Sequence, residues 1–124
     1  EISCRIQAVV PMYGVHDILQ QARSRGSFEQ MNAAGRELCR SASPVTWVSA
    51  DDPPALILHG TKDALVPVEQ SQILYEHLQK SGVSARLQII KDAPHSFHLQ
   101  PAQQDLRAMV IAFFDQHLRE QQTD

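Results

Sequence analysis

Residues 53–60 of this chain read Pro-Pro-Ala-Leu-Ile-Leu-His-Gly, and the fold class can be inferred from them. The run over residues 55–59 is continuously apolar up to its histidine, and two prolines and a glycine bound it. A strand that is apolar at every position, and not at alternate positions, is buried on both faces, as in parallel sheets covered by helices. The segment therefore predicts the central strand of a parallel α/β sheet.

The residues after this strand predict a helix, a second strand and another helix. Pro67 suits the first position of a helix, and Gly82 suits a left-handed residue that ends it. We expect residues 86–90 to form the next strand and Pro101 to open the last helix. That helix carries an apolar stripe typical of core packing, formed by Leu106, Met109, Val110, Phe113, Phe114 and Leu118.

The residues before the central strand predict one more strand and an irregular helical region. Residues 6–13 are mostly apolar, and Pro11 must lie at the end of that strand because proline cannot donate a ladder hydrogen bond. Asp17 suits the cap of a helix, and Gly26 and Gly35 break the helical pattern that follows. We therefore expect one α/β domain over residues 1–124, with about three parallel strands in sequence order and flanking helices.

Composition excludes several classes of partner. The chain is 43% hydrophobic, which is enough to build a core, and 11 basic against 14 acidic residues leave a net charge of -3. No basic run could follow a nucleic acid or an anionic membrane, and the apolar runs are too short to span a bilayer. Cys4 and Cys39 match no metal-binding spacing and do not indicate a compartment; secretion or a periplasmic location would require a signal upstream of Glu1.

An acid and a histidine follow the two successive strands. Asp63 lies in the segment His-Gly-Thr-Lys-Asp-Ala-Leu-Val-Pro at residues 59–67, and His95 follows it by 32 residues. A strand-helix-strand crossover places its strands in parallel, so both following loops emerge at the same edge of the sheet. Neighbouring strands lie about 4.8 Å apart. We therefore expect Asp63 and His95 to meet.

Such a pair supplies two members of a hydrolytic triad. A carboxylate bonded to one imidazole nitrogen fixes the tautomer, so the other nitrogen can accept a proton from a nucleophile. Taken singly, Asp63 is equally well explained as a loop cap, and His95 is better explained as a solvated loop histidine. Because both residues are expected at the same edge of the sheet, a catalytic role for the pair is favoured over these separate explanations.

Other polar residues have simpler interpretations. Asp17 fits a helix cap better than a catalytic acid, Asp92 fits a turn, and His59 fits a packed, hydrogen-bonded residue. His95 and His98 lack a third residue at metal-ligand spacing. No glycine-rich phosphate cradle occurs, so neither a cofactor nor a metal is expected.

With these residues in view, the chain resembles the C-terminal part of an α/β-hydrolase of the esterase and lipase branch, which includes bacterial feruloyl and acetyl-xylan esterase-like enzymes. The resemblance is carried by residues 6–10, Tyr13-Gly14, Asp17, residues 42–46 and 53–60, Asp63, Val66-Pro67, Gln70-Ser71, Leu78, Gly82 and residues 95–97. By this resemblance Asp63 matches the triad acid and His95 the triad base. Ser96 stands where glycine is often found, and Pro11 is a further departure.

The third triad member is missing from the sequence. No Gly-x-Ser-x-Gly segment occurs in the 124 residues, and in the resembled family the serine precedes the strand that residues 6–12 match. We expect the chain to be the C-terminal part of a catalytic domain, inactive alone, from a parent that hydrolyses a small ester. The alternatives are a serine peptidase of the prolyl-oligopeptidase type and a non-catalytic interaction module. An open edge at residues 6–10 also predicts a homodimer.

Overall fold

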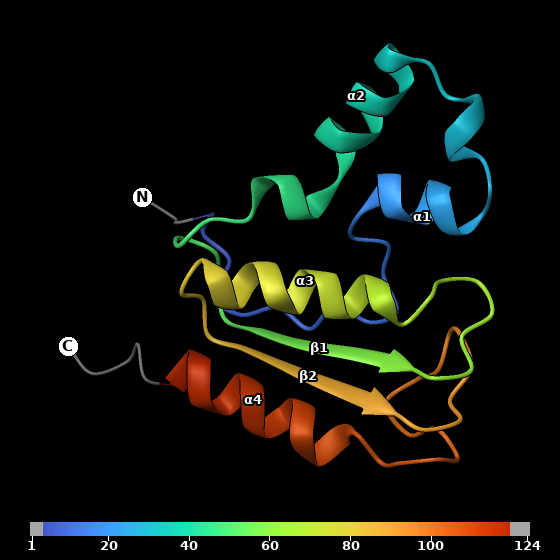
Figure 1. Cartoon of the computed structure of the whole chain (residues 1–124). Coiled ribbons are helices and arrows are strands. Elements are labelled where there is room, and N and C mark those ends of the chain that lie inside the picture. The colour runs from blue at the N-terminus through green and yellow to red at the C-terminus, as the bar shows by residue number, and fades with distance from the viewer. Residues whose placement is uncertain (1–3, 120–124) are drawn as a thin grey trace.

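The computed structural model describes residues 4–119 (Figure 1). Helices dominate the first half of the chain, and alternating strands and helices form the second. In chain order the elements are α1 (Ile18–Ser24), the 3₁₀ turn η1 (Phe28–Gln30), α2 (Ala33–Ala42), the 3₁₀ turn η2 (Pro44–Trp47), β1 (Ala55–Gly60), α3 (Glu69–Lys80), β2 (Ala85–Ile90) and α4 (Arg107–Arg119).

The two regular strands pair in parallel, as predicted. Their register runs from Ala55 opposite Ala85 to Gly60 opposite Ile90, and α3 forms the crossover between them. Every residue of β1 is buried, which is the reason for its unbroken apolar sequence. The α/β class is therefore confirmed.

The expected first strand is present only as an irregular segment beside β1. Two isolated parallel bridges, Val9 with Ala55 and Met12 with Leu58, attach it to the free side of β1. Four backbone hydrogen bonds of 2.9–3.0 Å join residues 9–13 to residues 54–58. Pro11 interrupts this ladder because it has no N–H to donate. The sheet thus has two regular strands and one bridged segment, in sequence order, in place of three full strands.

The side chains of β1 alternate between two cores. Leu56 and Leu58 join Val110 and Phe113 of α4 in one cluster, whereas Ala55 and Ile57 join Leu74 and Leu78 of α3 in the other. Figure 1 shows α3 and α4 on opposite sides of the strands. This alternation, which has the two-residue period of a strand, sends His59 toward α3.

Two helix predictions need adjustment. Gly26, with φ of 71°, separates α1 from η1 as predicted, but Gly35 lies inside α2. The amide of Gly35 donates to the side chain of Asn32, which caps α2. Pro101 does not open α4, since it begins a turn and the helix starts only at Arg107. Within residues 4–119, no helix is both long and apolar enough to cross a bilayer.

The homodimer predicted through residues 6–10 remains a prediction. Ile6 is 61% exposed beside the segment whose other side pairs with β1. A strand at the edge of a sheet can add a strand of another chain, so we propose that the purified 124-residue chain forms a homodimer through this segment. Light scattering after size exclusion checks the mass. A monomer at all concentrations would contradict the prediction.

Candidate active site

The loops after β1 and β2 are joined by hydrogen bonds beyond the ends of the strands. The amide of Thr61 donates to Ile90 O at 3.1 Å, and the amide of Lys62 donates to Ala93 O at 3.0 Å. The amide of Asp92 donates to Oγ1 of Thr61 at 2.8 Å. The parallel pairing therefore continues into the loops that carry the candidate residues.

Gly60 makes this close approach sterically feasible. A Cβ atom at this position would lie 2.1 Å from Ala93 O and 2.9 Å from Ala93 Cβ. These distances are far below van der Waals contact, and Ala93 is itself fully buried. Glycine is required here for space, because the second loop lies directly against the backbone of the first.

Asp63 and His95 meet, as their spacing predicts. Nδ1 of His95 lies 2.7 Å from Oδ2 of Asp63. The carboxylate side chain is 0% exposed, whereas the imidazole is 24% exposed. The acid is thus enclosed by protein, and the histidine lies between the acid and the solvent.

The carboxylate of Asp63 is surrounded by donors. Its Oδ1 accepts from the amides of Leu65 at 2.9 Å and Val66 at 2.8 Å, and its Oδ2 faces both His95 and, at 3.2 Å, Nε2 of His59. Burial opposes ionisation of Asp63, but the hydrogen bonds from Val66, His95 and Leu65 outweigh it, so the pKa of Asp63 lies below its ordinary value. The group is therefore a carboxylate at neutral pH.

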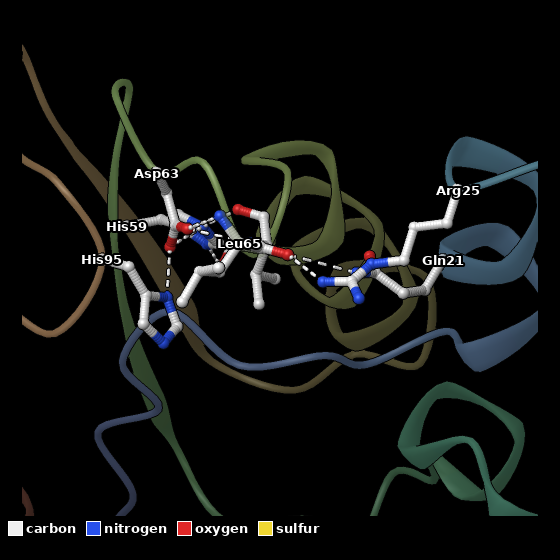
Figure 2. Close-up of polar contacts among 8 residues, drawn as sticks. Gln21, Arg25, His59, Asp63, Leu65 and His95 are labelled. Carbon is white, nitrogen blue, oxygen red and sulfur yellow. Dashed lines mark hydrogen bonds and ion pairs between the residues drawn. The ribbon is translucent and has the colours of Figure 1, made fainter.

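The loop over residues 63–66 is also held from the side of α1. Figure 2 shows Gln21 and Arg25 reaching the carbonyl of Leu65. The distances are 3.3 Å from Nε2 of Gln21 and 2.7 Å from a terminal nitrogen of Arg25. Helix α1 and its C-terminal cap residue Arg25 thereby hold the loop that carries Asp63. The positions of Gln21 and Arg25 in the sequence did not indicate this role. A cleft of about 360 Å³ lies between α1 and this loop.

Tyr13 packs against the histidine from the bridged segment. Its ring centroid lies 4.7 Å from that of His95 and 5.0 Å from that of Phe97. The Tyr13 backbone has φ of 43°, and its amide donates to Leu58 O at 2.9 Å. The sequence marked Tyr13 only as part of the family resemblance, because a contact between residues 13 and 95 leaves no local pattern.

The other polar candidates match their simpler interpretations. Asp17 caps α1 by accepting from Gln20 N, and Asp92 occupies a turn with φ of 61°. Ser96, in place of the family's frequent glycine, also has a left-handed φ of 62°. Among residues 4–119, no cluster of three His, Cys, Asp or Glu side chains is placed to hold a metal ion.

His16 is a buried histidine that sequence reasoning did not identify. It is 8% exposed, and its Nε2 has no hydrogen-bond partner within the described part of the chain. Burial, followed by the nearby His59, lowers the pKa of His16 from 6.5 to about 4. His16 is therefore neutral at physiological pH.

The arrangement can accept a proton at one defined atom. A carboxylate accepts hydrogen bonds, so Nδ1 of His95 carries the proton and Nε2 carries a lone pair. Asp63 stabilises the imidazolium that forms when Nε2 takes a proton. The geometry is that of a general base oriented by a buried acid.

Comparison with known proteins identifies relatives of the chain. The BD-FAE family model matches residues 1–78, a range that includes Asp63 but not His95. The probable carboxylic ester hydrolase LipM of Mycobacterium tuberculosis (strain ATCC 25618 / H37Rv) is 37% identical over 108 residues, covering 79% of this chain. This chain spans only 25% of LipM.

Solved structures share the fold. The acetyl ester-xyloside bifunctional hydrolase from Caldicellulosiruptor lactoaceticus superposes with a TM-score of 0.73 and 25% identity, over 93% of this chain and 44% of that one. The acylaminoacyl peptidase of Pyrococcus horikoshii superposes with a TM-score of 0.72 over 98% of this chain and 22% of that one. Its identity of 20% indicates a common fold alone.

Gly60→Ala should destabilise the chain by about 3 kcal/mol or more, because the added methyl group overlaps the Ala93 carbonyl. Urea unfolding measures the loss. Gly26→Ala is the control, since its φ is 71° but no atom lies within 4 Å of an added Cβ, and we expect it to cost only about 1 kcal/mol. Equal losses in the two variants would contradict the crowding at Gly60.

The stability of the chain should fall as the pH drops from 6.5 to about 4. In this window His16 is protonated in the unfolded chain but stays neutral in the folded chain. The free energy of unfolding therefore falls by about 3 kcal/mol across the window. His16→Gln should flatten the fall, measured by urea unfolding at each pH. His77→Gln, at an exposed histidine, serves as the control and should leave the fall unchanged. A fall that persists in His16→Gln would show that another group titrates.

Proposed function

The chain belongs to the BD-FAE family and has an α/β-hydrolase fold, and from this premise we propose that its parent protein is a serine carboxylic-ester hydrolase. Asp63 acts as the triad acid and His95 as the general base. The observation that carries the proposal is the 2.7 Å contact between Nδ1 of His95 and the fully buried carboxylate of Asp63. The substrate is a small ester, in keeping with the ester hydrolase LipM among the relatives.

The proposed mechanism begins with proton transfer to His95. Nε2 takes the proton of a serine hydroxyl as the serine oxygen attacks the ester carbonyl, and it then returns the proton to the leaving alcohol. Asp63 stays ionised throughout and stabilises the imidazolium by charge and hydrogen bonding. Water repeats the two steps to release the acid from the acyl-enzyme.

The nucleophile is proposed to lie outside these 124 residues, which contain no Gly-x-Ser-x-Gly segment. The chain would then be the C-terminal part of a catalytic domain, in line with its coverage of 25% of LipM and 44% of the Caldicellulosiruptor enzyme. The oxyanion donors would lie outside it as well. The chain by itself would therefore be inactive.

A peptidase is the second candidate function. The likeness in fold to an acylaminoacyl peptidase favours it, because an acid and base pair of this kind serves amide cleavage as well as ester cleavage. Parallel assays of the parent on aryl esters and peptide amides separate the two. A higher kcat/KM on peptide amides would select the peptidase, and binding of either substrate without turnover would favour an interaction module.

In the parent protein, Asp63→Asn should lower kcat by about 10⁴-fold, because the amide no longer stabilises the required tautomer and imidazolium of His95. His95→Ala should cost at least as much. Asp92→Asn is the matched control, since this turn residue lies on the same edge and its carboxylate pairs with Lys62, and kcat should change less than about twofold. Aryl acetate hydrolysis measures all three.

The pure 124-residue chain should not hydrolyse aryl acetates, because it lacks both the nucleophile and the oxyanion donors. His95→Ala in the same chain is the control for any residual signal. Turnover by this chain that is abolished in His95→Ala would contradict the proposal that the nucleophilic serine lies outside these 124 residues.

A further inference from the structure

His59 is a buried histidine that the proposed mechanism does not use. Its side chain is 0% exposed, it points from β1 toward α3, and it contacts three groups. Nδ1 lies 2.7 Å from Oγ of Ser71, and Nε2 lies 2.9 Å from Val66 O and 3.2 Å from Oδ2 of Asp63. Figure 2 shows His59 and His95 beside the same carboxylate.

The acceptors around His59 determine its tautomer. A backbone carbonyl and a carboxylate both accept hydrogen bonds and donate none, so Nε2 must carry a proton. Nδ1 forms its hydrogen bond with the hydroxyl of Ser71, a group that can donate or accept and that is fully buried on α3. The Nε2–H group of His59 donates to Val66 O and lies beside the carboxylate of Asp63.

Through these contacts His59 acts on both oxygens of Asp63. The carbonyl of Val66 accepts from His59, and the amide of the same residue donates to Oδ1 of Asp63 at 2.8 Å. Nε2 of His59 also lies 3.2 Å from Oδ2, the oxygen that binds His95. Buried polar groups that are fully satisfied rigidify a network, because each partner restricts the next.

We propose that His59 is a positioning residue for Asp63, holding the carboxylate so that Oδ2 faces Nδ1 of His95. The contacts form one chain from Ser71 through His59 and Asp63 to His95. The assignment rests on the proposed function of Asp63 and His95 for its catalytic meaning. The effect of His59 on the tautomer of His95 can be measured without any catalytic turnover.

Two variants of the 124-residue chain separate positioning from packing. The amide of His59→Gln reaches the place of Nε2 and can still donate toward Val66 and Asp63, whereas the shorter amide of His59→Asn replaces only Nδ1. Nitrogen NMR of His95 reports the ratio of its Nδ1–H to Nε2–H tautomers. We expect His59→Asn to lower this ratio by about tenfold, the effect of one hydrogen bond, and His59→Gln to preserve it within about twofold.

The same spectra test the proposal in the unaltered chain. His59 should carry a proton on Nε2, and an Nδ1–H tautomer of His59 would overturn the assignment even if the variants failed to fold. An unchanged tautomer ratio of His95 in both variants would show that His59 contributes only to core packing. An equal fall of the ratio in both variants would show that a donor at the place of Nε2 does not control the tautomer. Either result would overturn the proposal. None of these NMR measurements depends on ester hydrolysis. The proposed function is tested separately by the activity assays of the parent protein, so a failure of one proposal can be told from a failure of the other.

Discussion

A Cβ atom at position 60 would lie only 2.1 Å from the carbonyl oxygen of Ala93, and the geometry of the candidate site depends on this close approach of two backbones. The in-register pairing of β1 and β2 brings the two loops to one edge. The hydrogen bond from the amide of Lys62 to Ala93 O then joins them. This backbone contact sets side by side the loops that carry Asp63 and His95.

One strand both builds the core and supports the site. Leu56 and Leu58 of β1 face α4, whereas Ile57 and His59 face α3, following the two-residue period of a strand. The register that buries the apolar residues therefore also buries His59 beside Asp63. A shift of one residue would exchange the two faces and lose both features, so core and site share one structural requirement.

Sequence reasoning failed where long-range contacts or local hydrogen bonds overrode a simple pattern. Pro11 leaves a gap in a ladder that is otherwise continuous, so the first strand is reduced to two bridges. Gly35 stays helical because the cap at Asn32 holds its amide, and propensity alone costs glycine only about 1 kcal/mol in a helix. Pro101 begins a turn, and the side chain of Asp105 accepts the Arg107 amide at the start of α4.

The α/β class, the buried central strand and the meeting of Asp63 with His95 could all be predicted from the residues in order, because they follow from apolar runs, turn residues and the handedness of a crossover. Only the tertiary structure revealed what surrounds the pair. Tyr13, Gln21, Arg25 and His59 come from other parts of the chain, and their contacts leave no periodic signal in the sequence. Local patterns specify elements, whereas the environment of a buried carboxylate is decided by which elements pack against it.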